Sequence, residues 1–346
     1  MSLPESKLEG GLIDPYLPLC ELHRHLDGSI RLQTILDLAD RHGIELPADD
    51  VESLAPFVHV NENEPGLMAF IARFKYLTEV LVDPDACRRV AYENVEDARL
   101  EGIDYVELRF SPWFMALRHG LDPQAVVEAC ADGVRAGQRD TGVQARVIGI
   151  LSRTYGADTC QRELEALLAC RDGLVAIDLA GDEAGFPASQ FVSHFALVRD
   201  AGLHVTIHAG EADGPASVWS AIRDLGAERI GHGFRAVEDP VLVDYLAESG
   251  IGLECCPTSN LHISAIESYA EHPIRRLAER GVRFCLNTDD PGISAITLRH
   301  EYEVAAPAVG LSAEQVRQAQ LAGLEMAFIS EAERQSLRDK AARRGS

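Results

Sequence analysis

Two histidines near the amino terminus, His23 and His25 in the segment ELHRHLDG, are the first residues whose types and spacing suggest chemistry. They lie two positions apart, so on a β-strand both imidazoles would point to the same face and could hold one metal ion. An H-x-H pair by itself is as often accidental as functional. A metal site therefore needs support from elsewhere in the chain.

That support comes from polar residues at the ends of later apolar runs, which we interpret as strands. HAGE contains His208 and Glu211, GHG contains His232, and NTDDP contains Asp289 and Asp290. In a parallel α/β barrel the carboxyl ends of all strands meet at one mouth, where such side chains converge. Adjacent buried carboxylates repel each other unless a cation or a proton intervenes, which argues against a purely structural aspartate pair.

Three imidazoles and one carboxylate suit zinc, which accepts nitrogen and oxygen ligands and keeps a position for water when it is catalytic. The predicted ligands are His23, His25, His208 and Asp289. The H-E-x-x-H pattern, and the H-x-E with P-C-x-x-C pattern of other zinc deaminases, do not occur, so the predicted site is of another kind. The other eight of the twelve histidines share no such placement, and we interpret them as surface or satisfied core residues.

The elements that must position these residues alternate between strands and helices. Short apolar runs rich in β-branched residues are separated by longer segments with helical periodicity, and several of those segments end at glycines that fit helix caps. The expected strands are residues 17–22, 104–110, 145–151, 174–179, 203–208, 229–232, 251–255 and 282–287. Eight strands are the number that closes a parallel (β/α)8 barrel, also called a TIM barrel.

The 346 residues suit one such barrel, and no linker, repeat or low-complexity tract divides them, so we expect residues 1–346 to form a single catalytic domain. The segment of about residues 30–83, between the first two strands, is too long for one crossover helix. It predicts extra helices that could form a lid. An apolar stripe at helical spacing within it faces either the core or a substrate pocket. The stripe consists of Leu67, Phe70, Ile71, Phe74 and Leu77.

Composition narrows the class of protein. With 32 basic against 55 acidic side chains, the formal net charge of -23 repels phosphate backbones and anionic lipids, so we expect neither nucleic acid nor membrane partners. The segment MSLPESKLEGG lacks the regions of a signal peptide, and no run approaches the roughly 20 apolar residues of a membrane span. The eight cysteines have no C-x-x-C spacing and do not form a disulfide framework. We therefore expect a cytoplasmic enzyme for a small molecule.

Several motifs together carry a family resemblance. LHRHLDGSIR, YVELRFSP, DLAGDE, HAGE, ERIGHG, TSN and NTDDPG occur in this order between about residues 16 and 335, and the chain resembles the adenosine deaminases of the amidohydrolase superfamily in their bacterial form. The resemblance implies a metallo-dependent (β/α)8 barrel with one Zn²⁺ per chain, held by the four ligands predicted above. It implies the hydrolytic deamination of adenosine and 2′-deoxyadenosine to inosine and deoxyinosine, with release of ammonia, in purine salvage.

The resemblance also implies roles for individual residues. Glu211 corresponds to the proton donor to purine N1, while His232 and Asp290 orient the attacking water and help to deprotonate it. The backbone N–H of Gly181 binds purine N3. Asp27 and His25 contact the ribose 5′-hydroxyl, and Asp290 also reaches the purine ring. Many relatives bridge two metals with a carboxylated lysine on the fourth strand, but LVAIDLAGD contains no lysine, so a mononuclear site follows.

Two alternatives stay open. The first is a deaminase of the same fold that acts on adenine or on a 5′-modified adenosine. The residue that discriminates between these substrates is Asp27. Adenine-specific relatives tend to carry glutamate there, whereas the shorter aspartate leaves room for ribose. The second is a nucleoside-binding pseudoenzyme, against which the intact set of Glu211, His232 and Asp290 argues. The sequence does not determine whether burial raises the pKa of Glu211 more than zinc lowers it, and it leaves the oligomeric state open.

Overall fold

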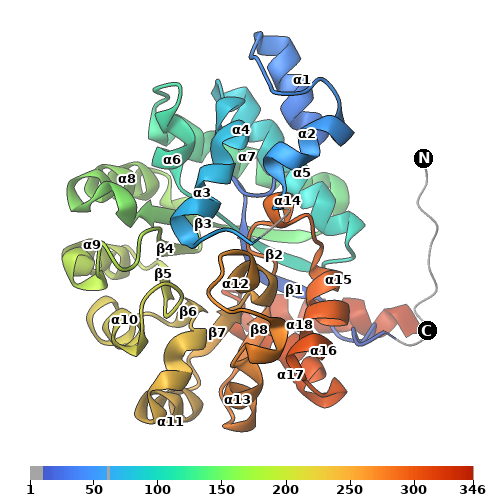
Figure 1. The fold of residues 1–346 in the computed structure, drawn as a ribbon, viewed down its shortest axis with the longest axis vertical. Coiled ribbons are helices and arrows are strands. Elements are labelled where there is room, and N and C mark those ends of the chain that lie inside the picture. The colour runs from blue at the N-terminus through green and yellow to red at the C-terminus, as the bar shows by residue number, and fades with distance from the viewer. Residues whose placement is uncertain (1–10, 61–62, 346) are drawn as a thin grey trace.

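The structure is a computed structural model that describes residues 11–60 and 63–345. Its centre is an eight-stranded sheet whose strands follow chain order, with every neighbouring pair parallel. Helices surround the strands (Figure 1). The strands are β1 (Cys20–His25), β2 (Tyr105–Phe110), β3 (Gln144–Ser152), β4 (Ala176–Ala180), β5 (His204–Ala209), β6 (Arg229–His232), β7 (Gly252–Cys255) and β8 (Phe284–Leu286).

The sheet closes on itself just beyond the end of β8. The backbone N–H of His25 donates to the carbonyl of Asp289 at 2.7 Å, and the N–H of Asp289 donates to the carbonyl of His23 at 3.0 Å. These bonds flank a parallel bridge between Arg24 and Asp289. The predicted (β/α)8 barrel is confirmed, and its closure sets Asp289 beside the histidine pair.

The first strand differs most from its predicted bounds. It spans Cys20–His25 rather than residues 17–22, because Pro18 has no N–H for a ladder and pairing with β2 begins at Cys20 and Tyr105. The strand then continues through the polar residues that were expected to follow it. His23 and His25 therefore lie within the strand itself and share one of its faces.

Several crossover helices end at glycine, as predicted, and three crossover helices begin after an aspartate that the prediction did not single out. Asp83, Asp122 and Asp239 each accept a backbone N–H from the first turn of a helix, and a proline follows each of them. Gly142 and Gly250 end two of these helices at φ of 71° and 74°. The principal crossover helices are α5 (Pro84–Leu100), α7 (Pro123–Thr141), α8 (Ala157–Ala169), α9 (Val192–Asp200), α10 (Pro215–Ser220), α11 (Pro240–Ser249), α13 (Ile274–Glu279) and α17 (Ala313–Met326).

Four extra helices lie between β1 and α5. They are α1 (Leu32–His42), α2 (Val51–Val58), α3 (Leu67–Ile71) and α4 (Lys75–Glu79), and a 3-10 turn joins the last two. The apolar stripe of this segment serves both of the purposes considered above. Leu67, Phe70, Ile71 and Phe74 line the cavity at the barrel mouth, whereas Leu77 is buried in the core. That this segment acts as a lid stays a prediction.

The cysteines and the helix lengths also bear on the expectations from composition. All eight cysteines are free, and Cys20, Cys255, Cys256 and Cys285 are buried, as expected for small core side chains. Within the part of the chain that the structure describes, no helix is both long enough and apolar enough to cross a membrane. Of the segment judged for a signal peptide, residues 1–11, all but Gly11 lie outside the described part.

Candidate active site and metal centre

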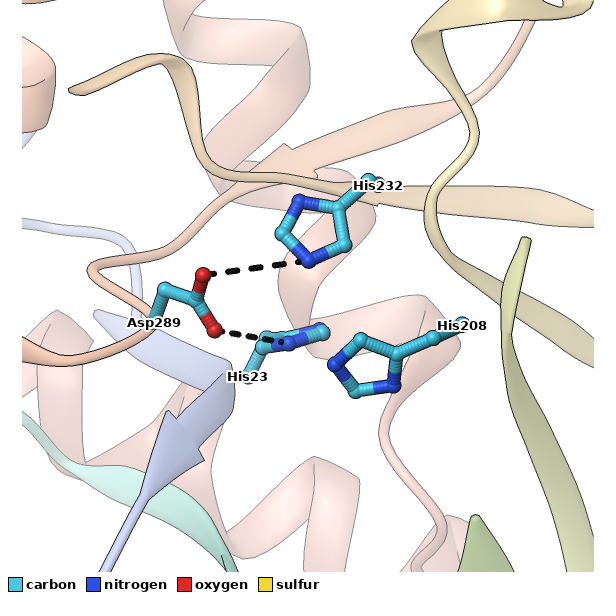
Figure 2. Close-up of side chains that lie close together, drawn as sticks. All are labelled: His23, His208, His232 and Asp289. Carbon is cyan, nitrogen blue, oxygen red and sulfur yellow. Dashed lines mark ion pairs between the residues drawn. The ribbon is translucent and has the colours of Figure 1, made fainter. Parts of the chain in front are cut away.

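The histidines and the aspartate predicted from the sequence come together at the carboxyl ends of the strands. His23 and His25 lie in β1, His208 in β5, His232 at the end of β6, and Asp289 after β8. Four of the five are buried, and the side chain of His25 is 13% exposed. Figure 2 shows four of them, all but His25, with their polar atoms turned toward one point.

The atoms that could hold a metal lie within a few ångströms of one another. One ring nitrogen or carboxylate oxygen from each of His23, His208, His232 and Asp289 lies within 4.8 Å of the others. His25 is not one of this group but lies beside it, with its Nε2 3.2 Å from Asp289 Oδ1 and 3.3 Å from His208 Nε2. The buried Nε2 of His23 makes no hydrogen bond, although it lies 3.1 Å from Asp289 Oδ1. This donor set fits a divalent metal such as zinc, and it contains one imidazole more than the four predicted ligands.

Carboxylates behind two of the histidines orient them. His23 Nδ1 lies 2.8 Å from Glu254 Oε2, and His208 Nδ1 lies 2.9 Å from Asp178 Oδ2. Donation from Nδ1–H to these carboxylates leaves the Nε2 lone pair of each ring for the centre, the arrangement that commonly fixes metal-binding histidines. Arg109 lies between the two carboxylates, 2.8 Å from Asp178 and 2.7 Å from Glu254.

The charges of Asp178, Glu254 and Arg109, which lie behind the histidines, are balanced inside the barrel. Burial opposes the ionisation of both carboxylates. For Asp178 the effect of burial is outweighed by His208 and Arg109, and for Glu254 it is outweighed by Arg109 and Arg229. The pKa values of Asp178 and Glu254 therefore fall below the ordinary range. Both carboxylates are therefore ionised acceptors for the histidine N–H groups. The sequence prediction assigned no role to Asp178, Glu254 or Arg109, although a charged residue in the middle of an apolar strand was a signal that could have found them.

Glu211 is positioned by a carboxylate that the prediction also missed. Glu183, in the loop after β4, accepts backbone N–H groups from four consecutive residues, at distances between 2.6 and 3.1 Å. These donors run from Gly210 to Asp213. Burial raises the pKa of Glu211 well above its ordinary value, and the neighbouring carboxylates of Asp289 and Glu183 raise it further. Glu211 is thus held in place and favours its protonated form.

Two site residues have backbone conformations that non-glycine residues seldom adopt. His232 has φ of 58° and Asp289 has φ of 65°. The left-handed region costs an ordinary side chain free energy, and such positions gather at functional sites. Both strained residues belong to the candidate metal centre.

One cavity joins the centre to the residues expected to bind the substrate. Asp27, Gly181, Glu211 and Asp290 all line it, together with His25 and His232. Asp27 Oδ1 and Asp290 Oδ1 are buried and have no hydrogen-bond partner. Two carboxylate oxygens that accept no hydrogen bond beside an open cavity are suited to a polar ligand that donates hydrogen bonds.

A glycine allows the close approach of β1 to the aspartate pair. A Cβ atom on Gly28 would lie 1.7 Å from Asp290 Oδ1, which no side-chain atom could tolerate. The glycine of HLDG is therefore required where the chain leaves β1 and passes Asp290.

Comparison with known proteins bears on the whole chain. The family model for adenosine deaminase matches residues 18–344. An adenosine deaminase of Vibrio cholerae is 58% identical over 334 residues, which cover 96% of this chain and 100% of that protein. An adenosine deaminase of Escherichia coli is 57% identical over 331 residues, which cover 96% of this chain and 99% of that protein.

Solved structures of lower identity share the fold. An adenine deaminase from Arthrobacter aurescens has a TM-score of 0.87 at 27% identity and covers 94% of this chain and 98% of its own. An amidohydrolase from Burkholderia ambifaria with bound Zn has a TM-score of 0.86 at 27% identity, covering 95% of this chain and 91% of its own. The N6-methyl-AMP deaminase of Arabidopsis thaliana has a TM-score of 0.79 at 27% identity, covering 94% of this chain and 96% of its own.

Proposed function

The chain belongs to the adenosine deaminase family, and we propose that it uses one Zn²⁺ per chain to convert adenosine and 2′-deoxyadenosine to inosine and deoxyinosine with release of ammonia. Its membership makes it a hydrolytic deaminase. The observation that carries the proposal is the convergence in one cavity of the histidine and aspartate cluster with Glu211, whose pKa is raised by burial and by neighbouring carboxylates. Purine salvage is the pathway in which we expect the reaction to serve.

His23, His25, His208 and Asp289 are the proposed zinc ligands. His25 is chosen over His232 because its Nε2 lies 3.2 Å from Asp289, whereas Nε2 of His232 lies 3.7 Å away. A zinc ion in such a site makes water nucleophilic near neutral pH. The absence of lysine from β4 and the single cluster among the described residues support a mononuclear site.

The remaining residues of the cavity have the roles of a general acid and of orienting groups. Glu211 donates its proton to purine N1, so that C6 becomes electrophilic and the ring gains no negative charge. His232 and Asp290 orient the water that adds to C6, and proton transfer to the amino group then lets the C–N bond break and ammonia leave. The backbone N–H of Gly181 binds N3, and Asp290 also contacts the ring.

The charge of the cavity favours a nucleoside over a nucleotide. Among the described residues that line it, none is lysine or arginine, and four are Asp27, Glu211, Asp289 and Asp290. A 5′-phosphate beside Asp27 would meet like charge and would find no lysine or arginine to pair with. Asp27 and His25 instead suit the 5′-hydroxyl. The Arabidopsis relatives, some of whose structures hold IMP or GMP, share the fold with this chain, but the lining of this cavity does not suit a phosphate.

A substrate panel measured with the metal content tests the proposal. We expect kcat/KM for adenosine and 2′-deoxyadenosine to exceed that for adenine by at least about 100-fold, with AMP and 5′-methylthioadenosine slower than adenosine. Loss of the ultraviolet absorbance of the adenine ring follows turnover, and elemental analysis of the same sample should find one zinc per chain. A preference for adenine would support the first alternative, and binding of adenosine without turnover would support the pseudoenzyme.

A further inference from the structure

A chain of buried hydrogen bonds leads from His232 to the outer wall of the barrel. Nδ1 of His232 lies 3.1 Å from the amide nitrogen of Asn260, in α12 (Pro257–His262). The amide oxygen of Asn260 lies 3.2 Å from Nε2 of His272, and Nδ1 of His272 lies 3.1 Å from the backbone nitrogen of Ile274, at the start of α13. His232, Asn260 and His272 are 1%, 0% and 3% exposed.

The outer end of this chain sets its direction. A backbone N–H can only donate, so Nδ1 of His272 must present a lone pair to Ile274. Burial also lowers the pKa of His272 to about 3, which keeps its ring neutral. The single ring proton of His272 therefore lies on Nε2 and is donated to the amide oxygen of Asn260.

The hydrogen bond from His272 also fixes the orientation of the Asn260 amide. Because its oxygen accepts from His272, its NH₂ group must face His232. An N–H donor directed at Nδ1 requires an unprotonated nitrogen there. The proton of the neutral His232 ring then lies on Nε2, the atom that faces Glu211 Oε1 at 3.4 Å and Asp289 Oδ2 at 3.7 Å.

We propose that Asn260 and His272 are positioning residues that hold His232 neutral with its proton on Nε2, so that Nε2–H donates a hydrogen bond to the oxygen that attacks C6. This inference rests on the proposed deaminase function and sharpens it. His232 in this tautomer offers no lone pair toward the centre, so it is neither a metal ligand nor the base. Removal of the proton from the attacking water then falls to Asp290, and His232 contributes orientation and stabilisation of the developing charge on oxygen.

The tautomer can be read without turnover. In the metal-loaded enzyme with 15N-labelled histidine rings, the Nδ1 and Nε2 resonances separate protonated from unprotonated nitrogens, and their loss in His232→Gln assigns them. We expect an unprotonated Nδ1 and a protonated Nε2 for His232 in the unsubstituted protein. A protonated Nδ1 would overturn the proposal, whether or not the protein deaminates adenosine.

Asn260→Asp reverses the relay, that is, the chain of hydrogen bonds from His272 through Asn260 to His232, with almost no change in the shape of the side chain. One carboxylate oxygen still accepts from His272, but the other demands a proton on Nδ1 of His232. We expect the Nδ1 resonance to become that of a protonated nitrogen, with kcat lowered by at least about 100-fold. KM should change by less than about threefold, because Asn260 does not line the cavity. A reversed tautomer with kcat within about twofold of the unsubstituted enzyme would overturn the proposal.

A second pair of variants separates the relay from its contribution to stability. His272→Phe keeps an aromatic ring but frees the amide of Asn260 to turn, so the Nδ1 resonance of His232 should show a mixture and kcat should fall. The matched control is His194→Phe, which removes another buried histidine, bonded through Nε2 to the carbonyl of Ala157. The control should lower Tm yet leave the His232 resonances and kcat unchanged. Equal effects of both variants on kcat would assign His272 a structural role only and refute the relay.

Discussion

At the scale of single residues, Glu211 shows how the site controls a proton. Burial and the nearby carboxylates raise its pKa, so it holds a proton at a pH where an exposed glutamate would be ionised. Glu211→Gln keeps the shape but cannot donate to N1. We expect kcat to fall between about 100-fold and 10,000-fold with zinc still bound, as measured by steady-state kinetics and elemental analysis of the same sample.

The control for this substitution lies two residues along the chain. Asp213→Asn alters a carboxylate that accepts the N–H of Gly214 and does not line the cavity, so kcat should stay near that of the unsubstituted protein. Unchanged turnover in Glu211→Gln would refute the role of Glu211 as proton donor. Loss of zinc in that variant would indicate that Glu211 supports the metal site instead.

Sequence reasoning found the residues that line the cavity but not those behind them. His23, His25 and Asp289 were predictable because their spacing and their places at strand ends follow from the alternation of a strand and the geometry of a barrel. Asp178 and Glu254 were not assigned, because their partners are His208 and His23, which lie far away in the sequence. Only the folded barrel brings those pairs together.

At the scale of elements, the turn after β5 depends on the loop after β4. Glu183 replaces four missing backbone acceptors with its two oxygens, so the turn that carries Glu211 needs both. Glu183→Gln would place an NH₂ donor against at least one N–H group, at a cost of about 1 to 3 kcal/mol. We expect kcat to fall by about 10- to 100-fold through displacement of Glu211, with a smaller change in KM and a lower Tm.

Asp182→Asn is the matched control for Glu183→Gln. Asp182 is the neighbouring residue, and its carboxylate accepts only the N–H of Gly185, at 2.9 Å, among the bonds of this loop. The control should leave kcat unchanged. If Glu183→Gln lowered Tm while kcat stayed the same, the turn would not depend on Glu183 for the placement of Glu211.

The predicted elements match the observed ones where periodicity decides, and differ where pairing partners decide. All eight strands were located, yet β1 begins at Cys20 because its partner β2 begins at Tyr105. The stripe from Leu67 to Leu77 was correctly identified as apolar, but it divides between α3, a 3-10 turn and α4. Periodicity alone could not reveal which of these residues face the cavity and which face the core, because both surroundings accept apolar side chains.

At the scale of the whole molecule, the closure of the barrel between β1 and β8 is stabilised by further contacts. β1 and β8 meet through the bridge at Asp289, and α17 packs against both strands. Cys20 and Leu22 of β1 and Cys285 of β8 pack with Leu324 and Met326 of α17 in one apolar cluster. The carboxyl-terminal helices are therefore part of the structure that holds Asp289 beside the histidine pair.

Glu301, in a π-helical segment (Glu301–Ala305) that precedes α17, bonds to the start of α12 and makes stability depend on pH. It is fully buried and accepts the backbone N–H of Thr258, and burial raises its pKa from 4.5 to about 8. The folded protein therefore binds this proton more tightly than the unfolded chain. The corresponding stability is complete below pH 4.5 and is lost as pH rises to about 8, by about 5 kcal/mol.

Glu301→Gln removes this titration and keeps the bond to Thr258. The Tm of the variant relative to that of the unsubstituted protein should therefore rise by several degrees between pH 5 and pH 9, measured by calorimetry on metal-loaded samples. Glu163, whose pKa burial raises to about 7, titrates equally in both proteins and cancels in the difference. A Tm difference that stayed constant or shrank with pH would mean that Glu301 is ionised in the folded protein across this range. The coupling of the carboxyl-terminal helices to the mouth would then rest on a buried charge rather than on a buried acid.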